Sequence, residues 1–418
     1  MDARTRRSAL QALRRAEGAL LRPEALPEEV QAELPGAREA LTSAIGDARI
    51  EPAFAERLAA LERATDAGPG SASARDYVDR HGVRGVVRFK TAGASTRLYE
   101  LPVETFPGHV NNVYLIVDGE LRCLFDVGSG TPTSRRDLAA GLAIVREAFG
   151  EAVQLEQIDL AIVSHAHIDH FGGALDLREK SRALLLVHEL DARVLAAFEE
   201  RIVIAERNLD VYMRRAGVED AVRQELIAMY GFSKQLFRSV EPDRRLRDGD
   251  LVAGGYRVHH VPGHCPGLIC LQVHDVLLTA DHVLSRITPN QMPESITPFT
   301  GLEHYFRSLG KVRKLEGVDL ALGGHEEPIT DLRSRVDEIT MFHLKRLDRV
   351  REICREGAHS VAGLSFALFG AQVGYGRLLA LTEAGAHVEY LHGRGELRIA
   401  NLSEVAARDD AVILYCLR

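Results

Sequence analysis

The pattern of apolar and polar positions divides the chain into a helical beginning, a β-rich middle and a helical end. Between residues 4 and 66, leucine and alanine recur every three or four positions among charged residues, which predicts amphipathic helices. From about residue 85 the pattern changes to short apolar runs separated by turns, which is typical of strands. The predicted strands are 86–89, 98–103, 112–117, 121–126, 158–163, 184–187, 251–252, 256–261, 269–273, 276–279 and 320–322.

Helices are predicted between these strands and after them. A helical segment at 190–240 interrupts the β-rich unit, and it would either form a wall of a binding site or simply extend the core. Three final helices precede short strands at 397–399 and 412–414, which is the order of a winged helix. The other predicted helices are 134–149, 302–315, 342–356, 360–369 and 376–391. We therefore expect a helical appendage and linker at 1–74, an α/β domain at 75–335 and a winged-helix-like domain at 336–418.

Composition places the chain among ordinary globular proteins. Apolar residues make up 46% and charged residues 27%, and no apolar run approaches the roughly 18 residues of a membrane span. Because the N-terminus lacks the apolar core of a signal peptide and the five cysteines are scattered, we expect a cytoplasmic protein without disulfides. The formal charge of −8 argues against general attraction to nucleic acid, although a local basic groove stays open. The arginine, alanine and glycine bias suggests a GC-rich bacterial genome.

The densest chemistry follows the predicted strand at 158–163. Within six residues the chain carries His165, His167, Asp169 and His170, and two glycines come next. Imidazole and carboxylate groups are natural ligands of zinc and neighbouring transition metals. A strand that ends in a tight loop directs such side chains to one place, whereas histidines at a sheet edge add little to packing. The stretch therefore predicts a metal-binding loop.

Three more strands lead into loops that carry a histidine or an aspartate. His264 lies in the turn-rich sequence Pro-Gly-His-Cys-Pro-Gly, Asp281 follows the strand at 276–279, and His325 follows the strand at 320–322. A strand delivers a histidine or an aspartate into a loop four times in all. We expect these residues to meet the first cluster.

The order and spacing of these residues resemble the metallo-β-lactamase superfamily of hydrolases. The Pro-Gly-His-x-Pro-Gly, Asp-His-Val-Leu and Gly-His-x-Glu-Pro-Ile loops are similar to those of hydroxyacylglutathione hydrolases. The segment 386–391 looks like the winged-helix tail of the β-lactamase-like protein 2 group, so the resemblance covers residues 85–400. Cys265 and Glu326 stand where this family usually has threonine and glycine, and neither change removes an expected ligand.

The resemblance implies an αββα sandwich with two divalent metal ions at one edge. Zinc is expected, with iron or manganese as alternatives, because the same donor set accepts all three. The first ion would be held by His165, His167 and His264. The second would be held by Asp169, His170 and His325. Asp281 would bridge the two ions, and Asp169 would steer a shared water whose pKa falls from about 15.7 to roughly 7, so that it supplies hydroxide at neutral pH.

Two reaction classes fit such a site. We favour hydrolysis of a small-molecule thioester, ester or lactone, with acyl-CoA, acyl-carrier and glutathione thioesters first, because the loops are similar to those of hydroxyacylglutathione hydrolases. The alternative is a metal-dependent endoribonuclease or phosphodiesterase, since the winged-helix group includes an RNA-cutting member. Basic residues at 345–355 alternate with acidic ones, which disfavours a nucleic-acid groove. No membrane partner is expected, and a homodimer stays open.

Weaker candidates lie near these loops. His282 follows the expected bridging aspartate and is a candidate for a helper role. His109 and Asn112 precede a strand near the expected edge and are candidates for lining the pocket. Arg286 and Asn290 either meet an anionic substrate or face solvent.

Overall fold

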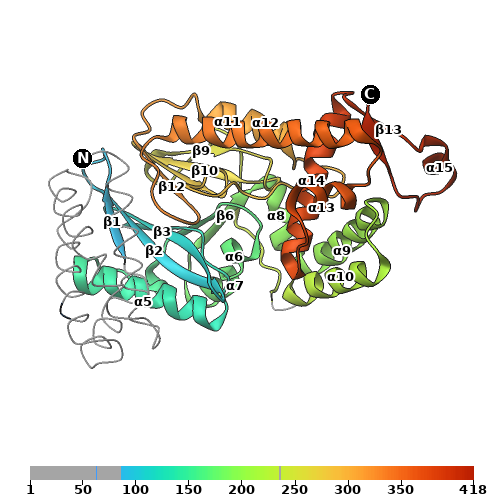
Figure 1. Cartoon of the computed structure of the whole chain (residues 1–418). Helices are drawn as coiled ribbons and strands as arrows, with labels where there is room; N and C mark the ends of the chain where they lie inside the picture. Colours follow the sequence, from blue (N-terminus) through green and yellow to red (C-terminus); the bar gives the residue numbers. More distant parts are fainter. Residues whose placement is uncertain (1–62, 64–85, 235–236) are drawn as a thin grey trace.

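The computed structural model describes residue 63, residues 86–234 and residues 237–418. The predicted appendage and linker at 1–74 lie outside the described residues, apart from Arg63. The described part is built around two β-sheets with helices on their outer sides (Figure 1). This αββα arrangement confirms the predicted α/β fold class.

The larger sheet contains seven strands in chain order. They are β1 (Val87–Lys90), β2 (Thr96–Phe106), β3 (His109–Asp118), β4 (Leu121–Phe125), β5 (Leu160–Val163), β6 (Leu184–His188) and β7 (Arg244–Leu246). The first four strands pair antiparallel, and β4 to β7 pair parallel. Parallel pairing places the carboxyl ends of β4, β5 and β6 at one edge, where loops usually carry ligand sites.

The smaller sheet contains five strands in the order β12-β11-β10-β9-β8. They are β8 (Leu251–Val252), β9 (Tyr256–His260), β10 (Ile269–Val273), β11 (Val276–Ala280) and β12 (Leu320–Gly323). Two backbone hydrogen bonds join the sheets at the edge that carries the polar loops: Ile269 N donates to Ser164 O (2.9 Å), and Asn112 N donates to Gly324 O (2.7 Å). The loops of both sheets are thereby fixed relative to each other.

Alternating residues of the central strands enter two different cores. On β3, Tyr114 and Ile116 face the smaller sheet, whereas Leu115 and Val117 face the outer helices. This period of two is the normal pleat of a strand whose two faces are both covered. The near-continuous apolar runs that predicted these strands thus reflect burial on both sides.

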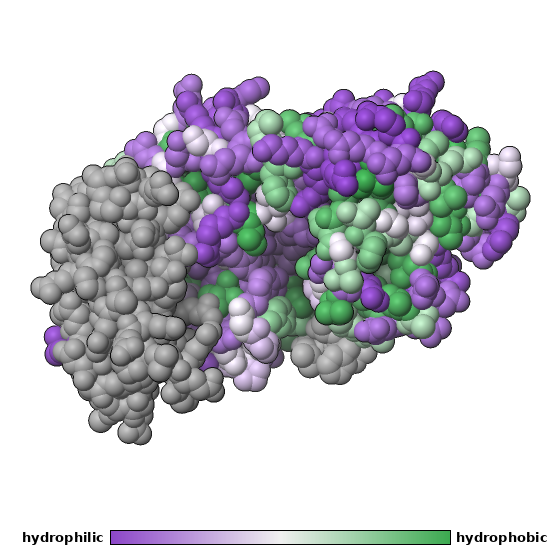
Figure 2. Space-filling model, in the orientation of Figure 1, coloured by the Kyte–Doolittle hydropathy of each residue, from purple (hydrophilic) through white to green (hydrophobic). Residues whose placement is uncertain are grey.

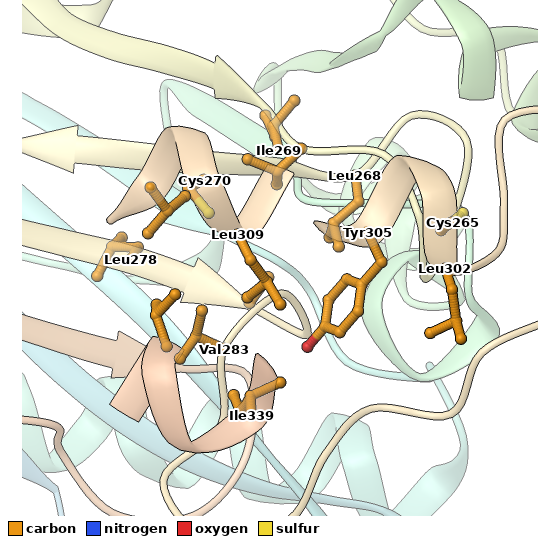
Figure 3. Close-up of a cluster of buried hydrophobic side chains, with 14 of the residues drawn as sticks. Cys265, Leu268, Ile269, Cys270, Leu278, Val283, Leu302, Tyr305, Leu309 and Ile339 are labelled. Carbon is orange, nitrogen blue, oxygen red and sulfur yellow. The ribbon is translucent and has the colours of Figure 1, made fainter. Parts of the chain in front are cut away.

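Helices cover the outer faces of both sheets. The larger sheet packs against α5 (Pro132–Phe149), α6 (Ile168–Phe171), α7 (Ala174–Lys180) and α8 (Glu189–Ala196). The smaller sheet packs against α11 (Leu302–Val312) and α12 (Leu332–Glu356). In Figure 3, Leu309 of α11 lies between Leu278 of β11 and Tyr305 of α11, and all three belong to one buried cluster with Ile339 of α12.

The remaining helices form the right-hand part of Figure 1. The segment predicted as an insertion is helical, with α8 followed by α9 (Phe198–Arg215) and α10 (Asp220–Lys234). The C-terminal part contains α13 (Val361–Phe369), α14 (Gly374–Gly393), β13 (Leu397–Ile399), α15 (Leu402–Ala407) and β14 (Tyr415–Leu417). The last strand was predicted at 412–414, but the pairing partners of β13 are residues 415–417, so that position was wrong.

The domain boundaries stay a prediction, and α12 crosses the one at 335/336. Among the described residues, no single helix is long and apolar enough to cross a membrane. Only α13 and α14 taken together meet that requirement, and they are bent by 112° at the break between them.

His188 at the end of β6 should make stability depend on pH. Its Nδ1 accepts a hydrogen bond from Leu190 N (3.3 Å) and so caps α8. Burial, with the stacked ring of His260 nearby, lowers the pKa of His188 from 6.5 to about 4. Between these pH values the unfolded chain binds a proton that the folded chain does not, so the stability contributed by His188 is lost as pH falls from 6.5 to 4.

The variant His188→Asn keeps a capping acceptor but does not titrate. Its unfolding free energy, measured with denaturant between about pH 4 and 7, should vary less with pH than that of the wild type. Equal slopes for the two proteins would contradict this assignment.

Candidate metal centre

The loop after β5 begins the site. Ser164 follows the strand, and its backbone N and its Oγ both donate to the buried carboxylate of Asp126 (2.7 and 2.8 Å). His167 then stands at the N-cap of the short helix α6, which carries Asp169 and His170 in its only turn. The tight loop and the single turn therefore direct all four side chains toward the sheet edge.

Three imidazoles from the two sheets form a first cluster. His165 Nε2 lies 2.9 Å from His167 Nδ1, and His167 Nδ1 lies 3.1 Å from His264 Nε2. Ligand atoms on tetrahedral zinc are roughly 3.3 Å apart, because each is about 2.0–2.1 Å from the ion. The three nitrogens therefore lie close enough together to share one divalent ion.

A second cluster lies beside the first and shares Asp281 with it. Asp169 Oδ2 lies 3.4 Å from His170 Nε2 and 3.7 Å from His325 Nε2. Asp281 Oδ2 lies 3.5 Å from His170 Nε2 and 3.7 Å from His264 Nε2, so one carboxylate oxygen faces both clusters. The structure thus brings together all seven residues that the sequence singled out.

The electrostatics of the clusters suit cations. Burial alone would raise the pKa of Asp281, but His325 and His170 hold it well below its ordinary value, and His170 does the same for the pKa of Asp169. Asp281 Oδ1 is buried and has no hydrogen-bond partner within the described part of the chain. A buried acceptor that lacks a donor, among converging imidazoles, is what a site for a divalent metal requires.

The ring nitrogens that point away from the clusters are held by hydrogen bonds. His170 Nδ1 donates to Asp126 Oδ2 (2.8 Å), and His325 Nδ1 donates to Val110 O (2.8 Å). His264 Nδ1 donates to Asn290 O (2.7 Å). Such bonds set the ring orientation and leave Nε2 as the free lone pair, as in most histidine metal sites.

Close backbone approach explains two glycines at the site. A Cβ on Gly173 would lie 2.3 Å from Val127 O, and one on Gly324 would lie 2.5 Å from Asp281 Oδ1. Three non-glycine residues with positive φ also border the site: Asp126 (66°), Ala280 (44°) and Glu326 (68°). Such conformations cost energy and often mark functional positions, so their grouping here supports a functional site.

The structure places some of the weaker candidates at the site and others away from it. His109 is at the site, with Nε2 3.2 Å from Asp169 Oδ2. Asn112 instead bonds the backbone of Gly323 and Glu326, and the ring of His282 packs edge-on against Tyr305 in the core.

Both Arg286 and Asn290 already have partners within the protein. Arg286 pairs with Glu326 and Glu327, while the side chain of Asn290 is bonded to α14. Cys265 is buried and donates to Asp191.

Three supporting residues were not predicted. Asp126 ends a predicted strand, and Asp281 follows one, so the position of Asp126 after an apolar run is a signal that could have indicated it. Asn111 donates to Asp169 Oδ2 (3.1 Å), and it lies between the two predicted pocket residues His109 and Asn112. Asp191 accepts from Ala166 N (2.8 Å) and Gly267 N (2.9 Å) and so ties two loops together, and no sequence pattern indicates this.

Comparison with known proteins agrees with this geometry. Residues 107–325 match the family model of the metallo-beta-lactamase superfamily. A metallo-beta-lactamase family protein from Thermus thermophilus is 25% identical, with a TM-score of 0.60 over 77% of this chain and 98% of that one. A beta-lactamase domain protein from Burkholderia ambifaria is 26% identical, with a TM-score of 0.62 over 79% and 94%. No protein with a curated function matches.

The fold and the two histidine–aspartate clusters define a class of metal-dependent hydrolases. The chain belongs to the metallo-beta-lactamase superfamily. Divalent metals are typical of this superfamily, and the donor set described above fits them.

Proposed function

We propose that the protein is a binuclear metallohydrolase that cleaves a thioester, ester or lactone. The observation that carries the two-metal assignment is the position of Asp281, whose Oδ2 faces a donor cluster on either side. His165, His167 and His264 would hold one ion. Asp169, His170 and His325 would hold the other. Zinc is the expected metal, and when bound the two ions would acidify water for attack and polarise the carbonyl of the substrate.

Asp169 would orient the attacking water and take its proton. Asn111 Nδ2 and His109 Nε2 both contact Asp169 Oδ2, at 3.1 and 3.2 Å, and so fix the direction of this carboxylate. The His109 side chain is 50% exposed. A proton taken up at Asp169 therefore has a short route to solvent through His109.

Apolar side chains near the centre support an acyl substrate. Val373 (81%), Tyr375 (46%) and Leu379 (38%) are exposed at the start of α14. Although part of the Tyr375 ring is exposed, its phenol group is desolvated by the surrounding protein, which raises its pKa, and the charge of Asp169 raises it further. In Figure 2, apolar residues gather over the C-terminal helices beside a hollow in the surface. An acyl chain would cover such a surface, whereas a polyanion would not.

Ion pairs on α12 argue against the nuclease alternative. Arg349 pairs with Glu352 (2.8 Å), and Arg351 pairs with Asp348 (2.8 Å) and Glu396 (2.7 Å). A nucleic-acid groove needs cations that are free to contact phosphates. Arg349 and Arg351 are therefore already neutralised by neighbouring carboxylates.

The test is a panel of acyl-CoA, acyl-glutathione, simple ester and lactone substrates assayed beside single-stranded RNA. We expect turnover of at least one acyl substrate, with Val373→Glu lowering kcat/KM more for long acyl chains than for short ones. Leu402→Glu, an exposed apolar position on α15, is the matched control. RNA cleavage that is lost in Asp281→Asn, with no acyl substrate turned over, would overturn the proposal.

A further inference from the structure

The loop between β11 and α11 joins the metal centre to the C-terminal helices. In this loop the carbonyl oxygen of Asn290 accepts the Nδ1 proton of His264 at 2.7 Å. That single bond selects the tautomer of His264 and aims its Nε2 at the first cluster. The position of Asn290 therefore decides where one ligand of this cluster points.

Helix α14 holds this part of the loop at three places. Asn290 Nδ2 donates to Leu379 O (2.9 Å), and Thr382 Oγ1 donates to Asn290 Oδ1 (3.1 Å). Gln291 N donates to Glu383 Oε2 (2.7 Å). The bonds come from one turn of one helix, so this turn fixes both the side chain of Asn290 and the next peptide.

Glu383 is buried and is fixed in turn by α12. Arg346 donates to Glu383 Oε1, and its guanidinium lies over the rings of Phe342 (4.3 Å) and Phe369 (4.9 Å). Only 6% of Glu383 is exposed. A buried carboxylate is tolerated when it is paired and hydrogen-bonded, and here both of its oxygens are used.

Two buried histidines, His343 and His387, lie beside the pair formed by Glu383 and Arg346. His343 Nδ1 lies 3.2 Å from His387 Nε2, and both lie near Glu383 in an arrangement that could hold an ion. However, Arg346 occupies Glu383 Oε1, and a guanidinium beside this oxygen opposes a second cation. Burial also lowers the pKa of His343 to about 2 and that of His387 to about 3, so the pair is neutral. The cluster is a hydrogen-bonded support.

We propose that Glu383, held by Arg346, is a positioning residue that orients His264 through the 290–291 peptide. The C-terminal helices thereby become part of the metal centre, although they supply no ligand to it. This proposal depends on one part of the proposed function, the assignment of His264 as a ligand of one ion.

The test compares Glu383→Gln with a control on the same helix. Glu389→Gln is the control, because Glu389 also bonds the loop, at Ser295, but five residues beyond Asn290. Metal-free proteins are titrated with Zn²⁺ against a chromophoric chelator, and Co²⁺-loaded proteins are followed by absorption spectroscopy. We expect Glu383→Gln to lower the affinity for one of the two ions by about 10- to 100-fold and to change the Co²⁺ spectrum. Glu389→Gln should match the wild type.

A second variant guards against loss of folding. Glu383→Leu combined with Arg346→Met removes the pair without leaving one charge buried, an exchange that often preserves stability. It should show the same selective loss of one ion.

Three results would overturn the proposal. They are a folded variant that binds both ions with wild-type affinity, an equal loss of affinity for both ions, and the same effect in Glu389→Gln. These measurements use no substrate. A failure of the acyl hydrolase assignment would appear only in the substrate panel, so the two failures are distinguishable.

Discussion

Asp281→Asn is expected to lower turnover by more than about 100-fold and to remove most of one metal ion. Outer partners of metal ligands already cost about 10- to 100-fold when mutated, and Asp281 faces the clusters directly. Asparagine keeps the shape but removes the charge between His170 Nε2 and His264 Nε2. Without that charge, two divalent cations would repel each other across the space that the carboxylate fills.

The measurement is metal content per chain after loading and dialysis, together with kcat on an ester or thioester that the wild type hydrolyses. Asp275→Asn is the matched control, because Asp275 precedes the strand β11 that Asp281 follows, and its side chain accepts a surface hydrogen bond from Ala92 N. If Asp281→Asn kept two ions per chain and wild-type turnover, the assignment of Asp281 as the bridge would be wrong.

Asp126→Asn should lower metal affinity and stability, although Asp126 is not an expected ligand. It contacts His170 only at Nδ1, the ring nitrogen that points away from the cluster. Its carboxylate accepts three hydrogen bonds, from Ser164 N, Ser164 Oγ and His170 Nδ1. In the variant, the NH₂ group of the new amide would face one of these three donors. That donor would then lack an acceptor in the core. Each hydrogen bond to a charged group contributes about 1.5–3 kcal/mol, so both stability and the orientation of His170 should suffer.

We expect Asp126→Asn to unfold at lower denaturant concentration and to bind metal about 10- to 100-fold more weakly. Denaturant unfolding and zinc titration test these two effects separately. Asp159→Asn is the control, since Asp159 accepts a backbone hydrogen bond from Arg122 N just before β5 begins, at the far end of the strand from His165. A folded Asp126→Asn protein with wild-type metal affinity would contradict this role of Asp126.

The strands and the seven clustered residues could be predicted because their signals are local. A buried strand is an apolar run, and a metal loop shows as polar ligand types directly after it, as at His165, His264 and His325. Parallel strands then place their carboxyl ends at one edge whatever the rest of the chain does.

The supporting residues could not be predicted because their roles are set by distant partners. Asp191 lies in a helix and meets Gly267, and Glu383 meets Gln291, with nothing in either local pattern to indicate the contact. The last strand was misplaced for a similar reason. Both 412–414 and 415–417 are apolar enough for a strand, and only pairing with β13 selects the second.

The two backbone hydrogen bonds between the sheets have a consequence for how the centre is assembled. Ile269 N to Ser164 O and Asn112 N to Gly324 O join the edges that carry the histidines. The five imidazoles and two carboxylates therefore lose their conformational entropy when the chain folds and not when an ion binds. An incoming cation meets a preorganised cage, so its binding energy goes into affinity and little of it into ordering the protein.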